Sequence, residues 1–199
     1  EVLAGRIGGL KIGKQLFTAH GPDAVARITG AGHRVFLDLK FHDIPATVAA
    51  AVAASTDLGC FMLTVHASGG SEMLRAAASA AAAAANPPLV VGVTVLTSLD
   101  DSDLNTVGQS GPVLHQVIRL AELSQECGLD GVVCSPQEIA TLRGTLGDDF
   151  KLIVPGVRPD WAGADDQKRI MTPADAVAAG ADYLVIGRPI TRATDPTKA

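Results

Sequence analysis

The chain has 199 residues, of which 47% are hydrophobic and 19% are charged, with a formal net charge of −5 at pH 7. This length and composition suit one globular domain over residues 1–199 and exclude an intrinsically disordered chain. The negative charge and the aromatic content of 4% argue against a nucleic-acid-binding protein, which needs a basic surface and often stacking rings.

Neither a membrane span nor a leader peptide is expected. No apolar stretch approaches the roughly 20 residues that a transmembrane helix needs, and residues 1–11 lack a basic start followed by an apolar block. Cys60 and Cys134 adjoin apolar strands, and the spacing of the cysteines does not suit a metal site. We therefore expect buried thiols in a protein of the reducing cytoplasm.

Short apolar runs rich in β-branched residues alternate with helical patterns along the whole chain. Continuous apolar runs of this kind are typical of parallel strands that are covered on both faces. The predicted strands are residues 10–13, 35–40, 61–66, 89–96, 131–134, 151–154 and 183–186. The predicted helices are residues 14–30, 45–58, 69–85, 112–127, 136–146 and 173–179.

This alternation predicts an α/β protein with the fold of a (β/α)8 TIM barrel. Such a barrel has eight strands, so its first strand is expected before Glu1 and its last helix after Ala199. A doubly wound open sheet is the alternative. That fold usually carries a G-x-G-x-x-G turn after its first strand, and the sequence contains none.

Asp38 and Lys40 are two charged residues of opposite sign within the apolar strand at residues 35–40. Side chains of a strand alternate in direction, so these two are expected to point to the same side. A buried charge is costly unless it is paired. With Asp43 three residues further on, the pattern indicates catalysis, although a structural ion pair or a solvated strand end is the alternative.

Other polar or cationic residues also follow predicted strands, where the active sites of barrels lie. Gly187 and Arg188 close the last strand and suit a phosphate, which a guanidinium and a backbone N–H can bind together. Residues 156–171 form a long loop, typical of a lid or a binding segment, and Gln167 within it could fold over a bound anion. The alternatives are an ordinary surface Arg and a solvated Gln.

The segment from Asp38 to Thr47 resembles the D-x-K-x-x-D-I-P-x-T motif of the orotidine 5′-monophosphate decarboxylase family. The resemblance continues, in the family's order, over nearly the whole chain. It includes the sequences LKIG at residues 10–13, VHA at 65–67, LTS at 96–98, PGVR at 155–158, DQ at 166–167 and IGRP at 186–189. The form is similar to the bacterial branch.

The resemblance implies a carbon–carbon lyase that converts orotidine 5′-monophosphate to uridine 5′-monophosphate and CO2, the last step of de novo pyrimidine biosynthesis. It also implies a cytoplasmic homodimer with shared active sites, no cofactor and no metal. The family carries a ribose-binding Asp on its first strand, which would precede Glu1.

The same resemblance implies a role for individual residues. Lys40 would donate a proton to C6, Asp38 would lie beside the departing carboxylate, and Lys11 would bridge Asp38 and the ribose. Asp43 and Thr47 would reach the neighbouring subunit's site, where Asp43 would hold Lys40. The remaining contacts would be to the pyrimidine, from Thr97, Ser98 and Pro155, and to the phosphate, from Arg158, Gln167, Gly187 and Arg188.

Two alternatives remain open. Sugar-phosphate decarboxylases and aldol-type synthases of the same superfamily use a D-x-K-x-x-D strand with Mg²⁺, but they need a further strand-end carboxylate. Here His66, Thr97 and Ser98 stand at the candidate positions. The other alternative is an inactive barrel fragment that binds phosphate without catalysis.

Overall fold

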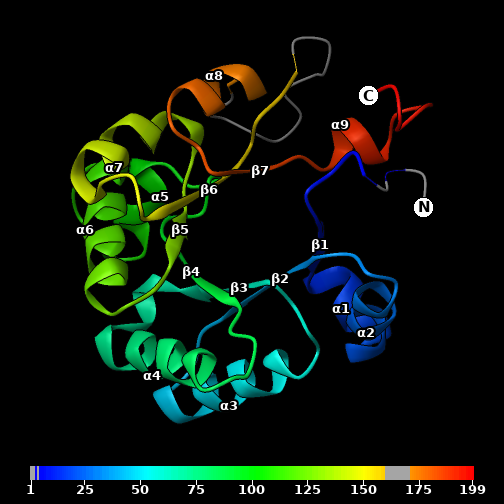
Figure 1. Ribbon diagram of the computed structural model, residues 1–199. Coiled ribbons are helices and arrows are strands. Elements are labelled where there is room, and N and C mark those ends of the chain that lie inside the picture. The colour runs from blue at the N-terminus through cyan, green and yellow to red at the C-terminus, as the bar shows by residue number, and fades with distance from the viewer. Residues whose placement is uncertain (1–2, 4, 160–170) are drawn as a thin grey trace. The chain divides into compact units, whose positions relative to one another are not determined.

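The structure, a computed structural model, describes residue 3 and residues 5–159 and 171–199. Within these residues, seven strands follow one another in the sheet in chain order, from β1 to β7 (Figure 1). The pairs β1–β2, β2–β3, β3–β4 and β6–β7 are parallel. Parallel strands in chain order with intervening helices are the pattern of the predicted (β/α)8 fold. A doubly wound sheet would reverse its strand order partway.

The chain divides into two compact units. The N-terminal unit comprises Gly5–Val93 and Leu123–Gly131, and the C-terminal unit comprises the described residues of Thr94–Glu122 and Val132–Ala199. Each unit has its own strands and helices. A single domain over residues 1–199 stays a prediction.

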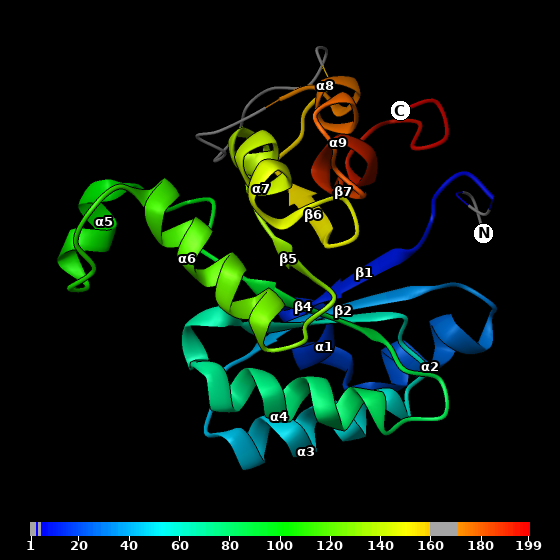
Figure 2. The ribbon, with the colours of Figure 1, turned by 60° about the vertical axis from the view of Figure 1, so that its left-hand side comes forward.

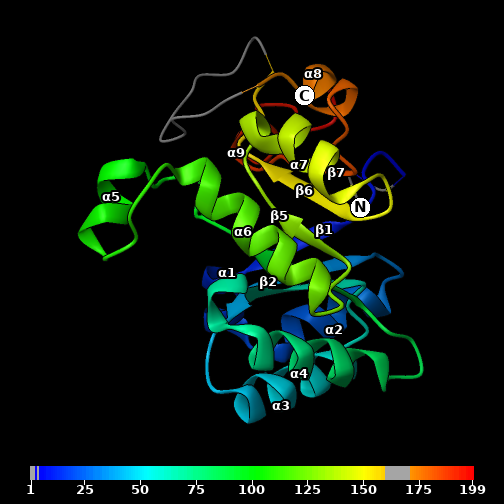
Figure 3. The same cartoon turned by 90° about the vertical axis from the view of Figure 1, so that its left-hand side faces the viewer.

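The N-terminal unit contains the first four strands and their helices. Helices α3 and α4 lie side by side along these strands (Figures 2 and 3). Their apolar faces, with Val48 and Val52 from α3 and Met73 and Leu74 from α4, are buried against strand residues such as Leu63. The elements are β1 (Leu10–Gly13), α1 (Lys14–His20), α2 (Pro22–Gly30), β2 (Val35–Phe41), α3 (Pro45–Thr56), β3 (Met62–His66), the 3-10 turn η1 (Ala67–Gly69), α4 (Ser71–Ala82) and β4 (Leu89–Val93).

The single helix predicted over residues 14–30 was wrong, because two helices occupy that stretch. Helix α1 ends at His20, and Gly21 follows with a φ of 63°. Few residues other than glycine adopt such a φ without strain. Pro22 then starts α2, at the position where its missing N–H costs nothing.

A bulge interrupts β2 near its carboxyl end. Leu37 pairs with Leu63 on β3, but Phe41 pairs with Val65, so β2 contains two more residues than β3 over this stretch. Within the bulge, Lys40 has a φ of 54° and is the one non-glycine residue with positive φ in the described part of the chain. Bulges commonly redirect a side chain next to an active site.

The second half of the chain contains two short helices that the sequence patterns did not predict, α5 and α9. Asp100 caps α5 by accepting the N–H groups of Ser102 and Asp103. The bounds are α5 (Asp101–Thr106), α6 (Val113–Glu126), β5 (Gly131–Val133), the 3-10 turn η2 (Pro136–Glu138), α7 (Ile139–Leu146), β6 (Lys151–Pro155), α8 (Pro173–Ala178), β7 (Tyr183–Val185) and α9 (Arg188–Thr191).

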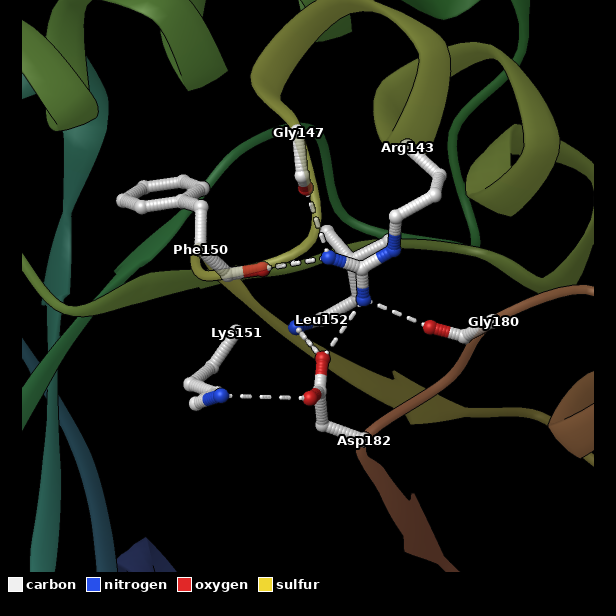
Figure 4. A network of polar contacts seen from close by, with 7 residues as sticks. All are labelled: Arg143, Gly147, Phe150, Lys151, Leu152, Gly180 and Asp182. Carbon is white, nitrogen blue, oxygen red and sulfur yellow. Dashed lines mark hydrogen bonds and ion pairs between the residues drawn. The ribbon is translucent and has the colours of Figure 1, made fainter.

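Arg143, on α7, connects the segments that enter β6 and β7 (Figure 4). Its Nη1 donates to the carbonyl oxygens of Gly147 and Phe150, at 2.8 and 2.9 Å. Its Nη2 donates to the carbonyl oxygen of Gly180 at 2.6 Å and to Asp182 Oδ2 at 2.7 Å. The network lies at the amino ends of β6 and β7, whereas barrel active sites lie at the carboxyl ends of the strands, so we interpret it as structural.

The predicted burial of Cys60 and Cys134 is confirmed. Both are buried free thiols, as is Cys127. Burial raises the pKa of the Cys60 thiol to about 11. Cys60 therefore stays protonated and unreactive near neutral pH.

Candidate active site

A carboxylate lies between two ammonium groups near the carboxyl ends of β1 and β2. Lys11 Nζ donates to Asp38 Oδ2 at 3.0 Å, and Lys40 Nζ donates to Asp38 Oδ1 at 2.7 Å. The Asp38 side chain is 12% exposed, whereas those of Lys11 and Lys40 are 35% and 24% exposed. Each ammonium has three N–H donors, so this triad can bind a further polar group while Asp38 stays paired.

Asp38 remains ionised in this setting. Burial is the largest influence on its pKa and favours the neutral form, but the charges and hydrogen bonds of Lys11 and Lys40 outweigh it. The pKa of Asp38 therefore lies below its ordinary value of 3.8. At neutral pH the Asp38 side chain is therefore a carboxylate that is paired with Lys11 and Lys40.

The expected pairing of Asp38 with Lys40 is confirmed, but regular strand alternation does not produce it. Lys40 lies in the β2 bulge with its backbone in the left-handed region. Its backbone N–H donates to Thr64 Oγ1 on β3 at 2.8 Å, and the same hydroxyl donates to Asp38 Oδ1 at 3.1 Å. Sequence reasoning missed Thr64, although a polar residue within an apolar strand was an available signal.

His66, at the carboxyl end of β3, lies next to His42, with 5.3 Å between the ring centroids. Burial, followed by His42 and the positive charges of Lys14 and Lys40, lowers the pKa of His66 to about 4. His66 is therefore neutral at physiological pH. It adds a hydrogen-bonding ring beside the triad without adding charge.

Asp43 and Thr47 lie on the exposed stretch that leads from the end of β2 into the first turn of α3. Asp43 Oδ1 accepts the N–H of Ile44 at 2.6 Å, and Ile44 is 66% exposed. Thr47 is in the first turn of α3 and is also exposed. Both side chains are therefore accessible on the surface of this chain, as residues that contact another subunit must be.

The other predicted site residues belong to the C-terminal unit. Thr97 and Ser98 follow β4, and Pro155 is the last residue of β6. Gly187 precedes α9 and Arg188 is its first residue. These positions all lie at or after the carboxyl end of a strand, as expected from the sequence.

Arg158 begins the predicted binding loop in a buried position. Its backbone N–H donates to the carbonyl oxygen of Met171 at 2.9 Å, and its Nη1 donates to the carbonyl oxygen of Val157 at 3.0 Å. The hydrogen bond to Met171 connects the start of the 156–171 loop to its end. Gln167, predicted to close over an anion, lies outside the described residues.

Two kinds of feature are absent from the part of the chain that the structure describes. No helix there is long and apolar enough to cross a membrane. No three His, Cys, Asp or Glu side chains gather there as metal ligands. The expectation of a reaction without metal therefore rests on the resemblance of the motifs.

Comparisons with known proteins agree with these observations. Residues 2–199 match the family described as Orotidine 5′-phosphate decarboxylase / HUMPS. The orotidine 5′-phosphate decarboxylase of Idiomarina loihiensis is 55% identical over 99% of this chain and 85% of its own length. That of Saccharophagus degradans is 55% identical over 96% of this chain and 80% of its own.

A solved structure supports the fold. The crystal structure of orotidine 5′-phosphate decarboxylase from Lactobacillus acidophilus matches with a TM-score of 0.85 and 40% identity, over 94% of this chain and 81% of that one. The predicted fold class is thus confirmed. The chain belongs to the orotidine 5′-phosphate decarboxylase / HUMPS family.

Proposed function

We propose that this chain converts orotidine 5′-monophosphate to uridine 5′-monophosphate and CO2, without metal or cofactor, as the last step of cytoplasmic pyrimidine synthesis. One observation carries the proposal: Asp38 is held between the ammonium groups of Lys11 and Lys40. Similarity to orotidine 5′-phosphate decarboxylases that are 53–56% identical to this chain supports it. A single domain over residues 1–199 is part of the proposal.

Lys40 is the proposed proton donor to C6. Loss of CO2 leaves a carbanion at C6 that the pyrimidine ring delocalises poorly. An ammonium about 4 Å from such a charge stabilises it by roughly 4 kcal/mol at an effective dielectric of 20. The 2.7 Å hydrogen bond to Asp38 Oδ1 holds the Lys40 ammonium in place, and an ammonium has N–H protons to donate. Lys40 then has a proton to deliver when CO2 leaves.

Asp38 and Lys11 have complementary proposed roles. Asp38 lies beside the substrate carboxylate, and the repulsion between the two is relieved as CO2 departs. Lys11 Nζ uses one N–H on Asp38 Oδ2 and has others for a ribose hydroxyl. The triad thus fixes the position of the substrate carboxylate relative to the ribose.

The partner subunit completes each site in this proposal. Asp43 of one subunit contacts Lys40 of the other, and Thr47 also reaches into the neighbouring subunit's site. The exposure of both side chains and of Ile44 supports the assignment. The protein is accordingly proposed to be a homodimer.

The remaining proposed contacts hold the ends of the nucleotide. Thr97, Ser98 and Pro155 border the pyrimidine. Arg158, Gln167, Gly187 and Arg188 bind the phosphate or close over it, because a guanidinium and backbone N–H groups suit that anion. The phosphate is remote from C6, so its binding energy can drive closure and exclude water.

The deciding experiment follows the absorbance of orotidine 5′-monophosphate after addition of the purified chain in EDTA. We expect rapid turnover, which a Mg²⁺-dependent enzyme of the superfamily would not give. Lys40→Ala should lower kcat/KM by at least about 10³-fold, since it removes the general acid, and should still bind uridine 5′-monophosphate.

Lys198→Ala, at an exposed position near the C-terminus, is the matched control and should turn over normally. Near-normal turnover by Lys40→Ala would overturn the proposed mechanism. A wild-type chain that binds uridine 5′-monophosphate but does not turn over would overturn the proposed activity.

A further inference from the structure

Thr64 is a buried polar residue in the middle of β3. Its neighbours Leu63 and Val65 are fully buried, as is Thr64 itself. A hydroxyl in such a place is costly unless it is hydrogen-bonded. Both functions of the Thr64 hydroxyl are used: it accepts the Lys40 N–H at 2.8 Å and donates to Asp38 Oδ1 at 3.1 Å.

The Lys40 N–H needs this acceptor because of the β2 bulge. The register of β2 against β3 shifts between Leu37 and Phe41, so Lys40 lies outside the regular ladder. Its φ of 54° is unfavourable for a residue with a Cβ, and such strain persists only where the surroundings impose it. The hydroxyl of Thr64 is the neighbouring group that fixes this backbone.

The same hydroxyl also fixes the carboxylate. Asp38 Oδ1 accepts from both Lys40 Nζ and Thr64 Oγ1, whereas Oδ2 accepts from Lys11 Nζ. Both lysines have long flexible side chains, but Thr64 is anchored in a strand. Of the three donors, Thr64 is therefore the one that restricts rotation of the carboxylate most.

We propose that Thr64 is a positioning residue for the decarboxylation, setting the left-handed backbone of Lys40 and the orientation of Asp38 through one hydroxyl. The inference rests on the proposed function for its kinetic consequence but not for its structural one. Thr64 does not touch the substrate in this assignment. It acts through the two residues that do.

Thr64→Val tests the inference, because valine keeps the shape and removes the hydroxyl. A displacement of about 1 Å can cost on the order of 10²-fold in rate, so we expect kcat to fall by about that factor. The dissociation constant of uridine 5′-monophosphate should change little, because phosphate and ribose contacts remain. Thr64→Ser restores the hydroxyl and should recover most of kcat.

A crystal structure of Thr64→Val gives a readout independent of activity. We expect Lys40 to leave the left-handed region or its Nζ to move out of hydrogen-bond distance of Asp38, and Thr64→Ser to retain both features. Thr94→Val is the matched control, because the buried Thr94 hydroxyl donates to the carbonyl oxygen of Val133 at 2.9 Å. It should lower stability and leave kcat unchanged.

An unchanged kcat and an unchanged Lys40 geometry in Thr64→Val would overturn the inference, as would loss of kcat in Thr64→Ser equal to that in Thr64→Val. If Thr64→Val does not fold, Thr64→Ala removes the same hydroxyl and is judged by the same outcomes. A wild-type chain without turnover would count against the proposed function, and the crystal structures would then decide the role of Thr64.

Discussion

His66, at the carboxyl end of β3, has a pKa that is lowered to about 4, chiefly by burial. Burial, the neighbouring His42 ring and the charges of Lys14 and Lys40 all oppose protonation, and only Asp38 favours it. The imidazole is thus kept neutral near Lys40, the proposed proton donor.

The shift of His66 predicts a pH dependence of stability. Its pKa is about 4 in the folded chain and 6.5 ordinarily, so the unfolded chain binds more protons between these values. The free energy of unfolding should therefore fall as pH decreases from 6.5 towards about 4. Urea denaturation of the wild type and of His66→Gln between pH 6.5 and about 4 measures this dependence. The free energy of unfolding of the variant should fall less than that of the wild type as the pH decreases.

His115→Gln is the control for this measurement, because His115 is exposed on α6. It should follow the wild-type pH dependence. Direct titration by NMR supplies the second check. A His66 ring that titrates near 6.5 would contradict the burial argument.

At the scale of elements, Arg143 joins α7 to the start of β6 and the start of β7 (Figure 4). Asp182 also accepts the Leu152 N–H at 2.8 Å and contacts Lys151 at 3.5 Å. Burial raises the pKa of Asp182, but the Leu152 N–H and the charges of Arg143 and Lys151 lower it overall. The Arg143 guanidinium therefore stabilises the starts of both β6 and β7.

Arg143→Met should destabilise the fold without altering chemistry. The side chains of Arg143 and Asp182 are 16% and 22% exposed, and breaking such a hydrogen-bonded pair costs about 3 kcal/mol. Arg75→Met is the matched control, because Arg75 and Glu72 are 56% and 83% exposed. Its cost should stay below about 1 kcal/mol.

Urea denaturation measures both variants, and kcat is measured in parallel. Equal losses of stability in the two variants would show that the Arg143 network is no stronger than a surface ion pair. A large loss of kcat in folded Arg143→Met would show that the network also serves the active site.

The order of the elements was predictable, as were most strand bounds to within about one residue. The reason is that apolar, β-branched runs are typical of buried strands. Residues 10–13 were predicted as a strand and form β1 with the same bounds. The break at Gly21 and helix α5 were missed. A single glycine does not reveal its φ, and α5 depends on a local Asp100 cap rather than on apolar periodicity.

The candidate site was predictable only in part. Opposite charges two residues apart in an apolar strand indicated that Asp38 and Lys40 would pair, and they do. The bulge, the left-handed Lys40 and its bond to Thr64 were not predictable. They depend on the register between two strands that are separated in sequence, which no local pattern encodes.

At the scale of the whole molecule, the proposed substrate contacts fall into two sets along the chain. Lys11, Asp38, Lys40, Asp43 and Thr47 belong to the N-terminal unit, and the described phosphate-binding candidates belong to the C-terminal unit. In the proposal, the residues assigned to C6 and the residues assigned to the phosphate therefore belong to different units of the chain. Loss of Lys40 should therefore lower kcat, whereas loss of Arg188 should weaken substrate binding and, because phosphate binding drives closure in the proposal, lower kcat as well.

The proposed exchange of Asp43 between subunits gives a complementation test. Lys40→Ala and Asp43→Ala protomers should each be inactive alone, but a mixed dimer has one site with native Lys40 from one subunit and native Asp43 from the other. With random exchange of equal amounts, half of the dimers are mixed, so about a quarter of wild-type activity should return. Lys40→Ala mixed with the Lys40→Ala/Asp43→Ala double variant should recover nothing. If mass measurements confirm exchange and activity stays absent, Asp43 does not act across the interface, and its bond to the Ile44 N–H would then describe its role within one chain.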